Sequence, residues 1–110
     1  MTLRPSLTLF IIAATLMTSA TPASAQTGDI QAGQAIYAAQ MCSLCHSRAG
    51  ESGPMAHVGG PLDGLASRRD AAWIEGYLRD PKSVIPNSQM PKTGLTDQEL
   101  ADLIAFLLAP

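Results

Sequence analysis

The sequence predicts an all-α domain, and three observations support that prediction. No stretch of the chain shows the alternation of apolar and polar residues that marks a half-buried strand. Near the C-terminus, Thr96 and Glu99 have the spacing of a capping box, and Leu95 and Leu100 flank it as a hydrophobic staple. An apolar stripe at helical spacing follows, made of Leu100, Leu103, Ile104, Leu107 and Leu108.

Two other main helices precede this one. The first runs roughly over residues 29–40. The middle helix begins after a cap at Asp70 and ends before Pro81, because the residue preceding a proline disfavours helical backbone angles. Side chains four residues apart pair along it, and these pairs are Trp73 with Tyr77 and Ile74 with Leu78.

The segment from Ser47 to Arg69 is predicted to be a loop, because it is rich in glycine and has no regular period. A loop of this length is unusual in a compact domain. We therefore expect it to wrap around something that the chain binds.

Residues 1–25 have the features of a cleavable secretory signal peptide. They contain one basic residue, Arg4, an apolar run over residues 7–17, and Ala23 and Ala25 at the A-x-A positions of a cleavage site. The run is shorter than the about 20 residues that a transmembrane helix needs. Cleavage after Ala25 would leave one domain, residues 26–110, exported to the periplasm of a bacterium. An uncleaved anchor is the alternative, and no other run approaches a membrane span.

Charge and size narrow the class of protein. The formal charge of the 110-residue chain is −2, and it becomes −3 without Arg4, which excludes a basic nucleic-acid binder. A domain this small often needs an additional stabilising element. A disulfide between its two cysteines would close a very small loop and stabilise little. A large apolar cofactor would supply the missing core.

Residues 42–46, CSLCH, contain both cysteines and suggest three kinds of site. A thioredoxin-like redox pair needs a strand–helix–strand context, which the pattern lacks. A structural zinc site needs four ligands, and His57 is the only other histidine. The third kind, covalent attachment of c-type haem, is typical of C-x-x-C-H. One helical turn would direct Cys42 and Cys45 to the same side and place His46 under the iron.

The second axial position of such a haem has four candidate ligands: Met41, Met55, His57 and Met90. Met41 adjoins Cys42 and cannot reach the opposite face. Met55 and His57 follow His46 closely in the glycine-rich segment. Met90 lies far enough along the chain to wrap around the cofactor, and Pro86 and Pro91 stiffen its segment. Met90 is therefore the preferred ligand.

Four further patterns lie in order along the chain. Gly33 and Tyr37 form a Gly-x-x-x-aromatic pair, residues 60–68 read GPLDGLASR, residues 77–90 read YLRDPKSVIPNSQM, and residues 102–107 read DLIAFL. Together with CSLCH, this set resembles the class I cytochrome c family, the small His/Met electron carriers, over residues 29–109. The Gly-Pro loop looks one residue shorter than the family pattern.

The resemblance implies the cytochrome c fold, with three main helices and loops wrapped around one covalently bound haem c and its iron. It implies that Cys42 and Cys45 bind the haem and that His46 and Met90 are the axial iron ligands. Residues expected in the haem environment are Pro61, whose carbonyl would accept from His46, Tyr77, beside the Met90 sulfur, and Arg68 or Arg69, facing a propionate. The aromatic ring of Phe106 would pack against the Gly33/Tyr37 pair, whereas Trp73 is assigned to packing.

The expected function is one-electron transfer between periplasmic redox partners, with the iron cycling between Fe(III) and Fe(II). The protein would not itself be an enzyme, and a dehydrogenase or a terminal oxidase is a candidate partner. We expect a monomer or a subunit of a hetero-complex. The alternatives are a haem c subunit of a larger dehydrogenase, or a haem enzyme or gas sensor with a displaceable sixth ligand. The basic residues expected near the haem edge, as a docking ring or as scattered solvated charge, are Arg48, Arg68, Arg69, Lys82 and Lys92.

Overall fold

The computed structural model describes residues 27–110, and the predicted signal peptide, residues 1–25, lies outside them. The helices of this range are α1 (Ile30–Ala39), α2 (Cys42–Cys45), α3 (Ala56–Gly59), the 3-10 helix η1 (Leu65–Ser67), α4 (Ala71–Arg79), α5 (Pro81–Val84) and α6 (Asp97–Leu108). The three longest, α1, α4 and α6, confirm the three predicted main helices. In the described part of the chain, no helix combines the length and apolar character needed to cross a membrane.

Side-chain caps fix where these helices begin. The Asp70 carboxylate accepts a hydrogen bond from the Trp73 N–H at 2.8 Å, which confirms the predicted cap of α4. The capping box of α6 is also confirmed, since Thr96 and Glu99 bond each other's backbone N–H groups. Pro81 ends α4 as expected, and it also opens α5, where a missing N–H costs nothing.

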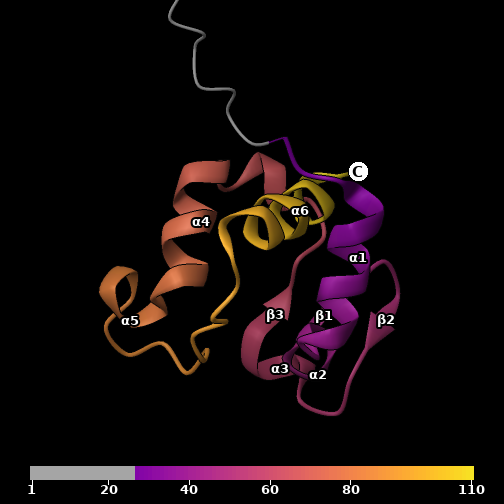
Figure 1. Cartoon of the computed structure of the whole chain (residues 1–110). Helices are drawn as coiled ribbons and strands as arrows, with labels where there is room; N and C mark the ends of the chain where they lie inside the picture. Colours follow the sequence, from indigo (N-terminus) through magenta and orange to yellow (C-terminus); the bar gives the residue numbers. More distant parts are fainter. Residues whose placement is uncertain (1–26) are drawn as a thin grey trace, which may run out of the picture.

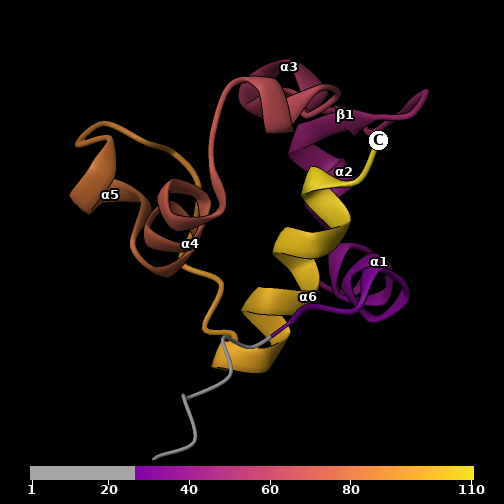
Figure 2. The same ribbon diagram turned by 90° about the horizontal axis from the view of Figure 1, so that it is seen from above.

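Helix α6 lies between α1 and α4, and it crosses α1 at a steep angle (Figures 1 and 2). Gly33 is where α1 meets α6, because a Cβ atom built there would lie 1.9 Å from the Asp102 carbonyl oxygen. One turn later, the Tyr37 and Phe106 rings pack with their centroids 5.3 Å apart. The expected contact between the first and last helices is therefore confirmed.

The hydrophobic core lies where α1, α4 and α6 converge. Its buried side chains are Tyr37, Ile74, Leu78, Leu100, Leu103, Ile104, Phe106 and Leu107. Helix α6 supplies five of these eight residues, because its apolar stripe faces both neighbouring helices. Leu65, Trp73 and Met90 pack against the core from the side and leave space there that the chain itself does not fill.

The prediction that residues 47–69 form only loop is wrong. They contain α3, η1 and part of a three-stranded sheet of β1 (His46–Arg48), β2 (Glu51–Ser52) and β3 (Gly60–Pro61), in the order β2-β1-β3. Strand β1 pairs antiparallel with β2 and parallel with β3. Strands of two or three residues have no room for a period, so tertiary pairing alone determines them. The all-α prediction holds only for the main elements.

Arg48 is a second correction. The sequence placed it among bases near the haem edge, but its guanidinium donates to the carbonyl oxygens of Phe106 and Ala109, at 2.9 and 3.2 Å. It also lies 4.1 Å from the Phe106 ring centroid. Arg48 thus satisfies carbonyl groups at the C-terminal end of α6, where a cation also opposes the negative end of the helix dipole.

Candidate functional site

Two adjoining cavities, of about 570 and 550 Å³, lie beside the core. Six residues line both of them, namely Cys42, His46, Gly59, Tyr77, Ile85 and Met90. The first cavity extends towards α4 and α6, and the second towards α2 and the segment over residues 87–93. Because they share these walls, we treat them as two parts of one crevice.

One wall carries the CSLCH motif. Cys42 and Cys45 begin and end the single turn of α2, and His46 follows as the first residue of β1. Before the turn, Met41 has a φ of 55°, a left-handed value that separates α2 from α1. Neither cysteine is joined in a disulfide, and Cys42 and His46 line both parts of the crevice whereas Cys45 lines the second.

The Cys42 thiol lies in a different environment from that of a thioredoxin-like cysteine. Burial raises its pKa above the ordinary value, so the thiol form is favoured over the nucleophilic thiolate. Thioredoxin-like sites require the opposite shift. Within residues 27–110, no three or more His, Cys, Asp or Glu side chains are grouped so that they could bind a metal ion.

The ring of His46 is oriented by a backbone carbonyl. Its Nδ1 lies 3.1 Å from the Gly60 carbonyl oxygen. Since a carbonyl can only accept, Nδ1 is the donor in this contact, which leaves Nε2 as the ring nitrogen available to a metal. We expected the Pro61 carbonyl to accept this hydrogen bond, and that prediction is wrong by one residue. The parallel pairing of β1 with β3 sets His46 against Gly60 instead. The Pro61 carbonyl instead accepts from Arg68 at 3.1 Å.

Two glycines, Gly59 and Gly60, make this arrangement possible, a role that was not predicted from the sequence. A Cβ atom on Gly59 would lie 2.5 Å from His46 Cε1 and 2.4 Å from the Cys45 carbonyl oxygen, so a side chain there would displace the imidazole. Gly60 has φ 74° and ψ −179°, a conformation that is essentially restricted to glycine. The adjacent glycine pair in the sequence was the available signal.

Another part of the crevice lining carries Met90, on the segment between α5 and α6. Met90 is half-buried and packs against the core. Its backbone N–H donates to the Ser88 Oγ at 3.2 Å, and that oxygen lies 2.6 Å from the Tyr77 hydroxyl. Tyr77 lines both parts of the crevice, as Met90 does. Ser88 joins these two residues, and no sequence motif pointed to it.

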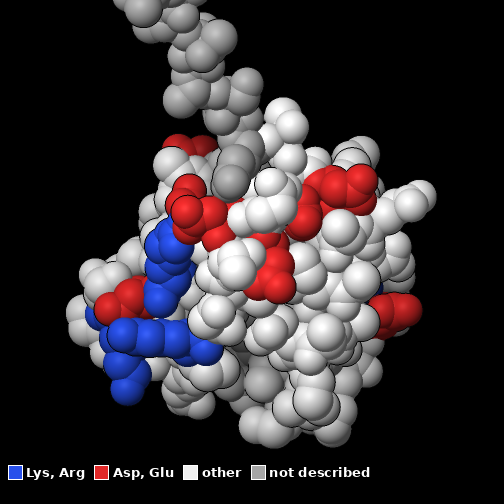
Figure 3. Space-filling model, in the orientation of Figure 1, with Lys and Arg blue, Asp and Glu red and all other residues white. Residues whose placement is uncertain are grey.

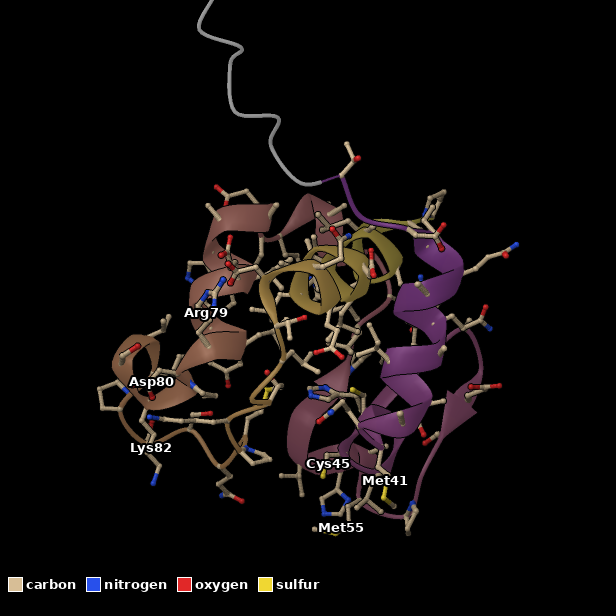
Figure 4. The ribbon with its side chains drawn as sticks, in the orientation of Figure 1. Met41, Cys45, Met55, Arg79, Asp80 and Lys82 are labelled. Carbon is tan, nitrogen blue, oxygen red and sulfur yellow. The ribbon has the colours of Figure 1, made fainter. Side chains whose placement is uncertain are left out.

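The other candidate axial ligands lie elsewhere. Met55 and His57 are exposed and line neither part of the crevice. Met41 touches the second part but is 62% exposed, on the same side as Cys42. Figure 4 shows Met41, Cys45 and Met55 together at one end of the molecule. His46 and Met90 are thus the imidazole and thioether side chains that line both parts.

The basic end of the crevice is formed by Arg68 and Arg69. Arg68 is anchored through its guanidinium to the carbonyl oxygens of Pro61 and Asp63, both at 3.1 Å. Arg69 lies 4.3 Å from the ring centroid of Trp73, and all of these residues except Asp63 line the first part of the crevice. Both arginines therefore remain candidates for binding an anionic group.

The comparisons with known proteins agree with this geometry. A family model described as "Cytochrome c" matches residues 30–109. The chain belongs to the cytochrome c family. Members of this family bind haem c, with its iron, covalently and carry electrons. The resemblance stated from the sequence patterns is thereby confirmed.

Three relatives illustrate the family. This cytochrome is 34% identical to "Cytochrome c2" of Blastochloris viridis, over 90% of this chain and 87% of the relative. It is 33% identical to "Cytochrome c-550" of Nitrobacter winogradskyi, over 73% and 89% of the two chains. It is also 33% identical to "Cytochrome c" of Guizotia abyssinica, over 79% and 95%.

The crevice of this cytochrome fits a haem in its chemistry. Its lining presents two thiols and an imidazole from the CSLCH motif, and a thioether from the separate segment that carries Met90. Apolar side chains from η1, α4, α6 and the segment after β3 complete the lining, namely Leu62, Leu65, Ile74, Leu78, Leu103 and Leu107. Two guanidinium groups lie at one end, where the carboxylates of an apolar macrocycle would need cations.

Proposed function

We propose that this cytochrome is a periplasmic one-electron carrier with both axial positions of its haem iron filled. His46 and Met90 would be the axial ligands, Cys42 and Cys45 would hold the haem through thioethers, and Pro61, Arg68 and Tyr77 would line its surroundings. The observation that carries the proposal is the crevice itself, which His46 and Met90 line from separate segments of the chain.

The residues of the crevice would each have a defined task. Gly60 fixes the tautomer of His46 through its carbonyl group, and Gly59 leaves space for the ring. The apolar wall excludes water from the iron. The haem, when bound, supplies an iron that cycles between Fe(III) and Fe(II). Because both axial positions would be filled, electrons would pass through the exposed edge without a substrate binding to the metal.

Partners would approach the end of the molecule that carries the cysteines. The segments over residues 40–47 and 53–62 contain no Lys, Arg, Asp or Glu. They expose Met41 at 62%, Met55 at 45% and Val58 at 41%, and Met41 and Val58 line the crevice. An apolar, uncharged surface of this kind suits brief contact with the cofactor edge of another redox protein, whether a dehydrogenase or a terminal oxidase.

The test begins with the mature holoprotein purified from periplasm. Its intact mass should be that of the chain from Gln26 plus one haem, joined through Cys42 and Cys45. The ferric protein should show the weak absorption band of sulfur-to-iron coordination near the red end of the visible spectrum. Met90→Ala should abolish this band and let carbon monoxide bind the ferrous form, because it removes the sixth ligand while His46 remains.

Met55→Ala and His57→Ala are the matched controls, since both side chains are exposed and line neither part of the crevice. Both variants should keep the band. If Met90→Ala leaves the spectrum unchanged, Met90 is not the ligand. If instead the unmodified protein binds carbon monoxide readily, the sixth position is open and a haem enzyme or gas sensor is the better assignment.

A further inference from the structure

The aromatic rings of Trp73 and Tyr77 form a stack on the side of α4 that faces the crevice. Their centroids are 5.1 Å apart and their planes differ by 10°, so the two rings lie nearly parallel. Arg69 extends the stack, with its guanidinium carbon 4.3 Å from the Trp73 centroid. Trp73 is half-buried, and all three residues line the first part of the crevice.

The inner ring of this stack is connected to the segment that carries Met90. The Tyr77 hydroxyl lies 2.6 Å from the Ser88 Oγ, and the same oxygen accepts the backbone N–H of Met90 at 3.2 Å. A serine oxygen can accept two hydrogen bonds and donate one, so it satisfies both neighbours at once. The position of Ser88, and through it the backbone of Met90, therefore depends on where the Tyr77 ring lies.

Beyond Met90, the segment is attached to α4 by a second contact. The Thr93 hydroxyl donates to the Leu78 carbonyl oxygen at 3.2 Å. The nearby ion pair between Lys92 and Asp80, at 3.6 Å, is exposed and contributes little. Of the two hydrogen-bonded attachments, only the one through Ser88 depends on the rotation of a side-chain ring. Helix α4 is thus bonded to this segment both before Met90, through Ser88, and after it, through Thr93. The bond to Ser88 forms only while the Tyr77 ring keeps one orientation.

We propose that Trp73 is a positioning residue for Met90. Its indole holds the Tyr77 ring in the plane in which the hydroxyl meets Ser88, and Ser88 then fixes the backbone of Met90. The proposal rests on the proposed function, in which Met90 is the sixth ligand of the iron. It replaces the expectation that Trp73 serves only to pack.

The test compares Trp73→Leu with Trp73→Phe in the ferric holoprotein and uses imidazole as the probe. Imidazole can bind the iron only while Met90 is displaced, so its apparent affinity reports how often the segment opens. Trp73→Leu removes the stack and should tighten the apparent affinity by about tenfold, because the open form becomes more populated. Trp73→Phe keeps a ring against Tyr77 and should shift the affinity by less than about threefold.

Two further variants separate positioning from general loss of stability. Leu100→Ala empties a buried site on α6 that lines neither part of the crevice, so it should destabilise the fold and leave imidazole binding near its original affinity. Tyr77→Phe keeps the stack but removes the hydroxyl. Combined with Trp73→Leu, it should add little to the effect of Trp73→Leu alone, since both changes break the same connection.

The proposal is overturned if Trp73→Leu and Leu100→Ala change imidazole affinity equally for equal loss of unfolding free energy. It is also overturned if Trp73→Phe behaves as Trp73→Leu does, or if the effects of Trp73→Leu and Tyr77→Phe simply add. Failure of the proposed function looks different, because the unmodified protein would then lack the sulfur-to-iron band. In that case imidazole binding would be tight before any change to Trp73.

Discussion

The Tyr37 hydroxyl is buried in the wall of the crevice and has no hydrogen-bond partner among the described residues. A buried polar group without a partner costs about 1–3 kcal/mol. We therefore predict that Tyr37→Phe raises the free energy of unfolding of the holoprotein by about 1 kcal/mol. Denaturant unfolding at neutral pH would measure this change. A clear loss of stability would show instead that the hydroxyl has a partner once the cofactor is bound.

The same hydroxyl predicts a dependence on pH. Burial raises its pKa above the ordinary value of 10.0, so above that pH the unfolded chain releases the proton while the folded chain keeps it. The folded state then binds more protons, and the free energy of unfolding falls as pH rises. Tyr37→Phe should lessen this fall, so its advantage over the unmodified protein should widen between about pH 9 and pH 11. Parallel curves for the two proteins would contradict this.

At the level of residues, some parts of the site could be predicted from the spacing of residue types in the sequence, and others could not. The two thiols, His46 and Met90 are chemically distinctive, so their types and order singled out residues that line one crevice in the structure. Gly59 and Gly60 act through an absent side chain and a backbone carbonyl, and composition does not reveal that. The partner of His46 was therefore placed one residue too late, since only the strand register decides which carbonyl faces the ring.

At the scale of elements, the contact between α1 and α6 depends on a close approach of backbones. A Cβ atom on Gly33 would lie 1.9 Å from the Asp102 carbonyl oxygen and 2.7 Å from the Phe106 Cβ, so Gly33→Ala must push the helices apart. We predict a loss of about 2–3 kcal/mol in unfolding free energy from this overpacking. Thermal or denaturant unfolding of the holoprotein would measure it.

Gly76 on α4 is the matched control, because a Cβ atom there would meet nothing within 4 Å. Alanine is the better helix former, so Gly76→Ala should stabilise the protein by about 0.5–1 kcal/mol. If Gly33→Ala stabilised the protein as well, helix propensity would outweigh the helix crossing, and the overpacking argument would be wrong. The Gly-x-x-x-aromatic pattern with Tyr37 marks Gly33 in the sequence, and Gly76 has no such pattern.

How well each helix or strand could be predicted depended on the strength of its local sequence signals, such as caps and apolar stripes. Helices α4 and α6 carry side-chain caps, and α6 has a full apolar stripe, so their starts could be read from the sequence. The three short strands carry no such signal, because they exist through pairing between residues up to 14 positions apart, such as His46 and Gly60. The role of Arg48 depends on the distant end of α6, and for that reason it was assigned to the wrong surface.

For the whole molecule, charge is distributed unevenly. Figure 3 shows acidic side chains gathered over the start of α6 and its surroundings, basic side chains along the α4–α5 side, and few charges at the end that carries α2 and α3. Arg79 is paired with Glu75 and Asp97, at 2.8 and 2.6 Å. Lys92 is paired with Asp80, whereas Lys82 forms no ion pair within residues 27–110. Because Arg79 and Lys92 are paired with acidic side chains, the α4–α5 side carries less unpaired positive charge than its basic residues alone would give.

This distribution predicts weak electrostatic steering of partners. Net charge governs long-range approach and local charge governs the docked pose, and here an acidic molecule would dock through a nearly neutral end. The second-order rate of electron transfer with the native partner should change by less than about tenfold between about 10 and 500 mM salt, over which the Debye length falls from about 30 Å to a few ångströms.

Charge variants locate the docking surface within the same measurement. Lys92 lines the second part of the crevice, so Lys92→Gln removes a positive charge beside the crevice. Gln34→Glu makes the same change in net charge at an exposed position of α1 that lines neither part. If docking is through the uncharged end, the two variants should alter the rate equally and slightly, because each shifts only the net charge. A much larger effect of Lys92→Gln, together with a steep fall in rate with salt, would mean that the basic residues beside the crevice bind the partner directly. The apolar side chains of Met41, Met55 and Val58 would then be peripheral to the contact.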